Sequence, residues 1–388
     1  MTISLPKYVL DCLNKLTDNG FEAWCVGGAV RDLIMGKKPY DFDITTNAQP
    51  ENIISLFPKT VPTGIAHGTV TVVTDCGNIE VTTYRTEGDY SDHRAPDSVT
   101  YVKSLDDDLK RRDFTINAIC YNPKFGLYDP LNGCSDIENR ILRAIGQPEK
   151  RFYEDALRIM RLFRFSAQLG FQIDRDSLIA SINQSELLQN ISVERIYSEL
   201  KKTLTAAEPQ RMSPLLKSGA LSFLGLPAIE IPEETANLPA VFALRFALLC
   251  RCGFINETNI LKKLKSDNET AVKAGIYRRL LDAPAPQSKA DIKRLLNFSS
   301  PEMVTDVLNF YGQNGGCAEN IKTKLTEILE MKEPYCIKML KIDGNVIQEA
   351  GITGSLIGRC LEKLTEHVIE HPADNNTATL KKLIAEMK

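Results

Sequence analysis

One stretch, Val26–Thr46, constrains the fold most, because signals for a turn, a helix and a strand follow one another in it. Two adjacent glycines, the second of them Gly28, predict a tight turn after a short apolar strand. Ala29–Met35 then predicts the start of a helix, and the chain returns in a second strand that carries Asp41 and Asp43. We therefore expect a strand–turn–helix–strand unit with two carboxylates on its second strand.

These residue types suit one chemistry when they lie together. Alternate residues of a strand share a face about 6.5–7 Å apart, so Asp41 and Asp43 can share a pair of Mg²⁺ ions roughly 3.5–4 Å apart. A glycine turn at a helix N-terminus lets phosphate oxygens approach backbone N–H groups. Each feature alone is common, and a lone Asp-x-Asp is more often a solvated strand end. Their combination favours nucleotidyl transfer.

The composition limits the partners and the location. A chain of 388 residues is too long for one compact domain, so we expect about two to four. No apolar run approaches the ~18 residues that span a bilayer, and the amphipathic N-terminus is not a signal peptide. Ten cysteines without a Cys-x-x-Cys pair fit reduced thiols in the cytoplasm. With a net charge of −3, any RNA contact must come from a local basic face.

Two β-branched runs, Gly68–Thr74 and Asn78–Arg85, predict a hairpin because a short turn joins them. Glu80 lies in the second run. A glutamate on a strand face is usually exposed to solvent, but Glu80 would give the metal site a third carboxylate if its strand lies beside Asp41 and Asp43.

A polar segment, Glu87–Tyr101, contains Gly and Pro and shows no clear periodicity. It predicts a mobile loop that returns to the sheet at Val99–Val102. A plain solvated connection is the simpler interpretation. Its length and its position soon after the third carboxylate favour a flap over an active site.

A second dense motif, Lys110–Ala118, places two arginines before an aspartate and a predicted helix. Arg111 or Arg112 can neutralise a phosphate with its planar guanidinium, and Asp113 can bond a ribose hydroxyl. A basic pair is usually surface decoration, so this motif gains meaning only beside the first.

A third motif lies in Phe152–Leu169, which predicts one continuous helix. Its polar residues recur every three positions and would form one stripe along the helix, namely Asp155, Arg158, Arg161 and Arg164. The usual meaning of such spacing is a salt-bridged surface. A chemical fit to nucleobases is the alternative.

That fit concerns the polarity of hydrogen bonds. Asp155 can accept from an exocyclic amine, and Arg158 can donate to the neighbouring ring nitrogen. Cytosine and adenine both present this pair, whereas uracil and guanine present a carbonyl beside a ring N–H. Sites built on such bonds can reject a mismatched partner by up to ~10⁴–10⁵. One Asp–Arg pair could therefore select C and A together without a nucleic-acid template.

After about residue 140 the pattern predicts helices and no further strands. Breaks rich in Pro and Gly fall at Leu226–Pro232, Ala283–Gln287 and Gly312–Gly316. His367 and His371 have a spacing that could bind zinc, but no third ligand accompanies them, so we favour a structural helix.

The chain resembles the class II tRNA nucleotidyltransferases, the CCA-adding enzymes of the polymerase beta-like nucleotidyltransferase superfamily. The resemblance rests on motifs in the family's order: GGAVRD, GKKPYDFDITT, IEVTTYR, RRDFTINA, YDPLNGCSDIENR, EDALRIMRLFRF and ERIYSEL. It is strong over roughly the first 205 residues, while DGNVI and GITGSLIG resemble the family's tail. It implies an α+β fold with a small mixed β-sheet head at 1–138. All-α neck, body and tail domains would follow at 139–205, 206–310 and 311–388.

The resemblance also implies template-independent addition of C, C and A to the 3′ end of tRNA from CTP and ATP, with Mg²⁺ as cofactor and release of pyrophosphate. Body and tail would hold the acceptor and TΨC arms of the tRNA by shape and phosphate contacts. The residue roles that it implies are Mg²⁺ ligation by Asp41 and Asp43, catalysis with help from Glu80, triphosphate contacts by Gly28 and Arg31, and nucleotide contacts by Arg112, Asp155, Arg158, Arg161 and Arg164.

Several alternatives stay open at this point. Relatives add only CC, only A or a poly(A) tail, but the intact loop with Asp92, Arg94 and Pro96 favours full CCA addition. An RNA-binding protein on a degenerate transferase fold is a non-enzymatic alternative, and the three intact carboxylates argue against it. No membrane partner is expected, and a homodimer is one option for the assembly.

Overall fold

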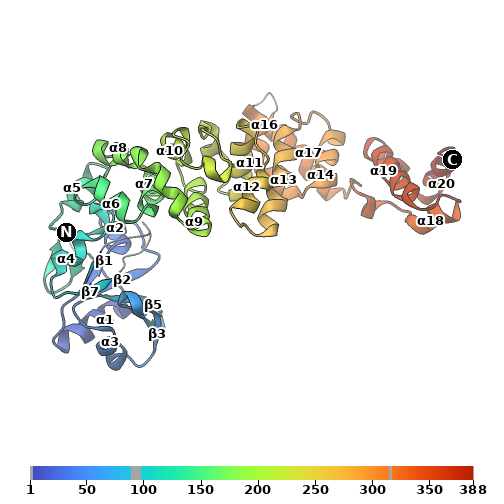
Figure 1. The fold of residues 1–388 in the computed structure, drawn as a ribbon. Coiled ribbons are helices and arrows are strands. Elements are labelled where there is room, and N and C mark those ends of the chain that lie inside the picture. The colour runs from blue at the N-terminus through green and yellow to red at the C-terminus, as the bar shows by residue number, and fades with distance from the viewer. Residues whose placement is uncertain (1–2, 89–97, 314–316, 388) are drawn as a thin grey trace. The chain divides into compact units, whose positions relative to one another are not determined.

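The computed structural model describes residues 3–88, 98–313 and 317–387, and the chain divides into two compact units, Met1–Ile231 and Pro232–Lys388. The boundary lies at the end of the Pro/Gly break predicted at Leu226–Pro232. A mixed β-sheet and helices form the first unit, while the described part of the second unit is helical (Figure 1). The α+β fold class is therefore confirmed, and the finer division into head, neck, body and tail stays a prediction.

The main sheet has seven strands in the order β3-β4-β5-β2-β1-β8-β9. The pair β2–β5 is parallel and the other neighbours are antiparallel, so the sheet is mixed. Its strands are β1 (Ala23–Val26), β2 (Phe42–Thr46), β3 (Thr60–Gly64), β4 (Thr69–Thr74), β5 (Gly77–Thr83), β8 (Cys120–Asn122) and β9 (Gly126–Tyr128). The predicted hairpin is thus β4–β5, and it is joined to the predicted strand–turn–helix–strand unit through β2.

The turn in that unit needs glycine. Gly27 has φ of 79° and ψ of −142°, a region that side chains rarely adopt, and it caps α2 (Gly28–Ile34). A Cβ built on Gly27 would also lie 3.6 Å from Oδ2 of Asp43. The glycine turn therefore brings backbone close to the carboxylate of β2, as the sequence predicts.

Two helices, α1 (Lys7–Asp18) and α3 (Pro50–Leu56), contact each other and the sheet (Figure 1). Tyr8 of α1 packs edge-on against Phe42, with ring centroids 6.1 Å apart. Because neighbouring residues of a strand point to opposite faces, Asp43 points away from α1. The acidic side of β2 is therefore the face that α1 leaves open.

One prediction beside the expected loop needs correction. The strand β7 (Val99–Tyr101) pairs with β6 (Arg85–Glu87) in a separate two-stranded sheet, so the chain does not return to the main sheet there. Asp92, Arg94 and Pro96 lie outside the described residues. The expected flap therefore stays a prediction.

Short elements were missed or mistaken. The strands β10 (Ile141–Leu142) and β11 (Gln172–Ile173) pair with each other beyond residue 140, where no strands are expected. Two residues are too few to show an alternating pattern. The RRD motif follows a helix, α4 (Leu105–Lys110), and the helix expected after it is only a single 3₁₀ turn, Thr115–Asn117.

The continuous helix predicted over Phe152–Leu169 is wrong. The chain forms α6 (Pro148–Glu154) and α7 (Leu157–Leu169), with Asp155 extended between them at φ −132° and ψ 101°. Its carboxylate accepts a hydrogen bond from the N–H of Leu157 at 3.1 Å, which offers the backbone an alternative to helical bonding. Asp155 therefore lies at a corner, and only the three arginines follow the α7 stripe.

The described part of the first unit also contains four further helices. They are α5 (Gly133–Glu138), α8 (Arg175–Asn183), α9 (Val193–Leu204) and α10 (Ser213–Lys217). The helix α7 is largely buried and contacts α9, so its arginines project from a rigid core element.

The second unit contains the remaining helices. They are α11 (Phe242–Cys252), α12 (Glu257–Lys263), α13 (Asn268–Asp282), α14 (Lys289–Phe298), α15 (Pro301–Asp306), α16 (Leu308–Gln313), α17 (Ala318–Glu330), α18 (Gly344–Glu349), α19 (Ser355–Glu370) and α20 (Thr377–Glu386). Ile347, Leu364 and Leu380 belong to one apolar cluster that joins α18, α19 and α20. In the described ranges of the chain, no helix has the length and apolar character that crossing a bilayer requires.

Candidate active site

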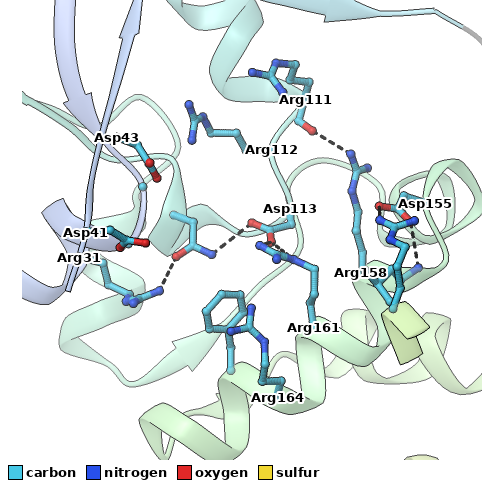
Figure 2. Close-up of a pocket in the computed structure, with 16 residues that line it drawn as sticks. Arg31, Asp41, Asp43, Arg111, Arg112, Asp113, Asp155, Arg158, Arg161 and Arg164 are labelled. Carbon is cyan, nitrogen blue, oxygen red and sulfur yellow. Dashed lines mark hydrogen bonds and ion pairs between the residues drawn. The ribbon is translucent and has the colours of Figure 1, made fainter. Parts of the chain in front are cut away.

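One cavity of about 480 Å³ in the first unit collects the predicted site residues (Figure 2). Every predicted site residue except Glu80 lines it: Gly28, Arg31, Asp41, Asp43, Arg112, Asp155, Arg158, Arg161 and Arg164. Sequence reasoning did not place Phe165 or Arg195 in the site, yet both line the cavity. The three sequence motifs therefore meet in one place.

The acidic end of the cavity is built by β2 and the residue just before it. Asp43 lies in β2, whereas Asp41 directly precedes the strand, so the prediction that the strand carries both aspartates is wrong for Asp41. Asp41 and Asp43 both line the cavity, and Glu80 of β5 is the register partner of Asp43 on the neighbouring parallel strand. Burial raises the pKa of Asp43 to about 6, repulsion from Asp41 and Glu80 adds to the shift, and Arg112 opposes it. The condition on Glu80 is met: its strand does lie beside that of Asp43.

These carboxylates fit a divalent cation. They are hard oxygen ligands, they repel one another, and Arg112 offsets part of the charge of Asp43. Within the described ranges, no three His, Cys, Asp or Glu side chains form a ready-made metal cluster. Of the two histidines whose spacing could bind zinc, His367 pairs with Asp374 through Nε2 at 2.8 Å.

A guanidinium is fixed beside the glycine turn. Arg31 is buried, donates from Nη1 to Oδ1 of Asn117 at 2.7 Å, and pairs with Asp32 at 2.7 Å. A Cβ on Gly28 would lie 3.5 Å from Nη2 of Arg31. Backbone N–H groups at a helix start and a held positive charge make this part of the cavity suitable for phosphate oxygens.

Two further arginines are held by one buried carboxylate. Asp108 of α4 is fully buried and accepts from Nε of Arg111 at 2.9 Å, from Nη2 of Arg112 at 3.3 Å, and from Oγ1 of Thr45 at 3.0 Å. Burial alone would raise the pKa of Asp108, but Arg112 and Arg111 outweigh it and hold the pKa below its usual value. Sequence analysis did not identify Asp108, because it lies in a run of three aspartates that is typical of an ordinary helix start.

The α7 arginines are paired in the same way. Arg161 donates to Oδ2 of Asp113 from Nη2 at 2.6 Å, and burial is overcome so that the pKa of Asp113 falls to about 2. Arg164 pairs with Glu199 of α9 at 2.6 Å and lies over the Phe165 ring, 4.0 Å from its centroid. Because the carboxylate of Asp113 already accepts from Arg161, the predicted contact with a ribose hydroxyl would have to use the remaining lone pairs of Asp113.

The far end of the cavity holds Asp155 and Arg158 (Figure 2). Asp155 accepts from Nη2 of Arg195 at 3.2 Å, while Arg158 donates to the carbonyl of Arg111 at 3.0 Å and to Glu154 at 2.9 Å. Burial raises the pKa of Asp155, and Arg195 and Arg158 limit the rise. A hydrogen-bond acceptor, Asp155, and a donor, Arg158, thus lie at one end of the cavity, and hydrogen bonds to neighbouring residues hold both in place.

Comparisons with known families cover most of the first unit. The family described as poly(A) polymerase head domain matches residues 23–143. A second family, described as the probable RNA and SrmB-binding site of polymerase A, matches residues 170–230.

Two similar proteins decide the family. A CCA-adding enzyme of Geobacillus stearothermophilus is 42% identical over 289 residues, which cover 72% of this chain and 71% of that protein. One from Leuconostoc mesenteroides is 36% identical over 396 residues, covering 98% of this chain and 97% of that protein. The chain belongs to the CCA-adding enzymes. The predicted family is thereby confirmed, and with it the activity class of a tRNA nucleotidyltransferase.

A solved CCA-adding enzyme supports the fold. The crystal structure of the Bacillus stearothermophilus CCA-adding enzyme in complex with CTP has a TM-score of 0.80 and 32% identity. The alignment covers 98% of this chain and 96% of that chain. CCA-adding enzymes belong to a nucleotidyltransferase superfamily that generally uses divalent metal ions.

Proposed function

We propose that this CCA-adding enzyme uses the cavity to transfer nucleotides from CTP and ATP to the 3′ end of tRNA, without a nucleic-acid template. One observation carries the proposal: the acidic pair Asp41 and Asp43 and the base-reading pair Asp155 and Arg158 line the same cavity. A nucleoside triphosphate can therefore have its phosphates at one end and its base at the other. The CTP complex of a relative supports CTP as a ligand.

The metal in this proposal is Mg²⁺, held by Asp41 and Asp43. Bound there, it would polarise the attacking 3′-hydroxyl and neutralise charge on the phosphates. The raised pKa of Asp43 supports this assignment, because a cation would offset the burial and the repulsion that raise it. Glu80, whose strand lies beside that of Asp43, would help to take up the proton of the hydroxyl.

Phosphate binding falls to the glycine turn and the arginines near it. N–H groups that follow Gly28 and the guanidinium of Arg31 hold the triphosphate. Arg112 stabilises the negative charge that develops on the departing pyrophosphate, and Asp108 keeps its guanidinium oriented. Arg161 and Arg164 complete the positive wall of the cavity.

Base choice falls to the corner between α6 and α7. Asp155 accepts from the exocyclic amine of cytosine or adenine, and Arg158 donates to the adjacent ring nitrogen. UTP and GTP offer the opposite polarity and would leave buried groups without partners, which is costly. Arg195 supports the role, because it fixes the carboxylate of Asp155.

The tRNA would be held by its acceptor and TΨC arms. The match of residues 170–230 to a probable RNA-binding family supports an RNA surface beside the cavity, and the helical second unit would add shape and phosphate contacts. The cytoplasmic location and the homodimer stay predictions.

Product sizing tests the proposal. A tRNA that lacks its CCA end is incubated with CTP alone, ATP alone and both, and the products are separated by length. We expect C-C with CTP alone, no extension with ATP alone, and C-C-A with both. A product that stops at C-C with both nucleotides would indicate a CC-adding enzyme, and a ladder of A residues would indicate a poly(A) polymerase.

A further inference from the structure

A second cavity, of about 230 Å³, adjoins the nucleotide site, and the proposed reaction gives it no ligand. The two cavities share Arg111, which lines both. The second cavity lies where α4, β6 and α6 meet, and its charged lining residues are Asp107, Lys110, Arg111, Lys150, Arg151 and Glu154. Cations outnumber anions in this lining.

The two acids of this cavity do not cancel its charge. Glu154 pairs with Arg151 at 3.2 Å and also with Arg158 of the nucleotide site at 2.9 Å. Asp107 and Lys110 are largely exposed and 3.9 Å apart, so their interaction is weak. Lys150 is exposed and forms no ion pair with the residues that the structure describes. Lys110 and Lys150 therefore have charge to offer to an anion.

The position of the cavity indicates which anion. The proposed triphosphate site is at Gly28 and Arg31, and Figure 2 shows Arg31 and Arg111 well separated around the nucleotide site. The carbonyl of Arg111 accepts from Arg158, so the second cavity borders the base-reading end. A strand whose 3′-hydroxyl reaches the acidic end must keep its own phosphates outside the triphosphate site.

Chemistry narrows the choice further. The end of the growing strand changes with every added nucleotide, so a group that holds it must not depend on its sequence. Contacts between lysine or arginine and backbone phosphate meet this condition, because they position a strand without reading its bases. We propose that the second cavity binds a backbone phosphate of the tRNA strand being extended, a role that rests on the proposed function.

The test compares the KM for tRNA with the KM for CTP in the enzyme and its variants. Lys150→Ala and Lys110→Ala should each raise the KM for tRNA lacking CCA by roughly fivefold, and leave the KM for CTP unchanged. The slope of log KM for tRNA against log salt should fall in magnitude by about 1 for each lysine removed. Lys150→Glu should give a larger rise than Lys150→Ala.

Lys124→Ala is the matched control, because Lys124 is an exposed lysine of the same unit, in the β8–β9 turn, that pairs only weakly with Asp18 at 3.6 Å. It should change neither KM nor the salt slope. An unchanged KM for tRNA in both cavity variants, with normal incorporation, would overturn this inference alone. A raised KM for CTP or for pyrophosphate in the reverse reaction would assign the cavity to the nucleotide and also overturn it. If the wild-type enzyme adds no nucleotide, the proposed function itself fails.

Discussion

The two ends of the 480 Å³ cavity differ in how their charges are balanced. At the β2 end, carboxylates repel one another, and repulsion from Asp41 and Glu80 helps to raise the pKa of Asp43. At the α7 end, the arginines are matched by partners: Arg158 by Glu154, Arg161 by Asp113 and Arg164 by Glu199. One end is short of positive charge, whereas the other is balanced before any ligand arrives.

The difference shows how each end would act on a substrate. Carboxylates that repel one another gain from a bound cation, so the acidic end is completed by its cofactor. Paired arginines have fixed orientations and lose little entropy on binding, so the other end can discriminate between bases. Asp108 connects the two ends, because it accepts from Arg112 beside the acids and from Arg111, whose carbonyl accepts from Arg158 of α7. We expect chemistry to depend on the first end and base choice on the second.

The largest effect should come from the acidic end. Asp41→Ala should lower nucleotide incorporation by about 10³-fold or more, because the metal loses one of its two proposed protein ligands. Binding of tRNA, measured by filter retention, should stay within about twofold of the wild type. Asp18→Ala, an exposed aspartate at the end of α1, should behave as the wild type. Robust incorporation by Asp41→Ala would refute the metal assignment.

The next effect concerns base choice. Asp155→Ala and Arg158→Ala should each reduce discrimination against UTP by roughly 10²-fold, since a mismatched base no longer meets groups of like polarity. Competition between CTP and UTP in single-turnover incorporation measures this ratio. Glu149→Ala, an exposed acid on α6, is the control. Unchanged fidelity in both variants would exclude the base-reading role.

A smaller effect tests whether the arginine end is balanced by its own carboxylates. The pKa of Asp113 is about 2, below its usual value, so ionised Asp113 contributes roughly 2 kcal/mol to stability at neutral pH. This contribution is complete above about pH 4 and is lost as the pH falls towards 2. Urea unfolding should therefore show Asp113→Asn less stable than the wild type at pH 7, with a gap that narrows below pH 4. A gap that is independent of pH would contradict the pairing with Arg161.

The smallest effect concerns Arg195, which donates a hydrogen bond to the proposed base-reading residue Asp155. Arg195→Ala removes a donor to Asp155, so discrimination against UTP should fall by roughly three- to tenfold, less than in Asp155→Ala. The same competition assay measures it, and the incorporation rate with CTP should change little. An effect as large as that of Asp155→Ala would mean that Arg195 contacts the nucleotide itself.

Local patterns made part of this site predictable. The glycine turn, α2, β2 and the β4–β5 hairpin have signals within their own residues. The spacing of Asp41 and Asp43 predicted that both face one site, and both line the cavity, although Asp41 lies just before β2. Hydrogen-bond polarity predicted the roles of Asp155 and Arg158, and the family resemblance implied nucleotide contacts by Arg161 and Arg164. These roles stay predictions.

Other parts depend on contacts that a sequence does not display. The break at Asp155 arises because its carboxylate caps the next turn, and a helical stripe of polar residues looks the same with or without that cap. Arg164 could have paired with many acids, and the packing of α7 on α9 selects Glu199. The three-residue strands β8 and β9 are too short to show alternation.

Equilibrium binding of CTP and UTP with Mg²⁺ present, measured by calorimetry on the wild type, Asp41→Asn and Asp155→Asn, tests the division of labour most directly. The account predicts that Asp41→Asn weakens both nucleotides equally and keeps their affinity ratio, because it acts on the shared triphosphate. It predicts that Asp155→Asn brings the ratio close to one. A changed ratio in Asp41→Asn together with an unchanged ratio in Asp155→Asn would contradict the account.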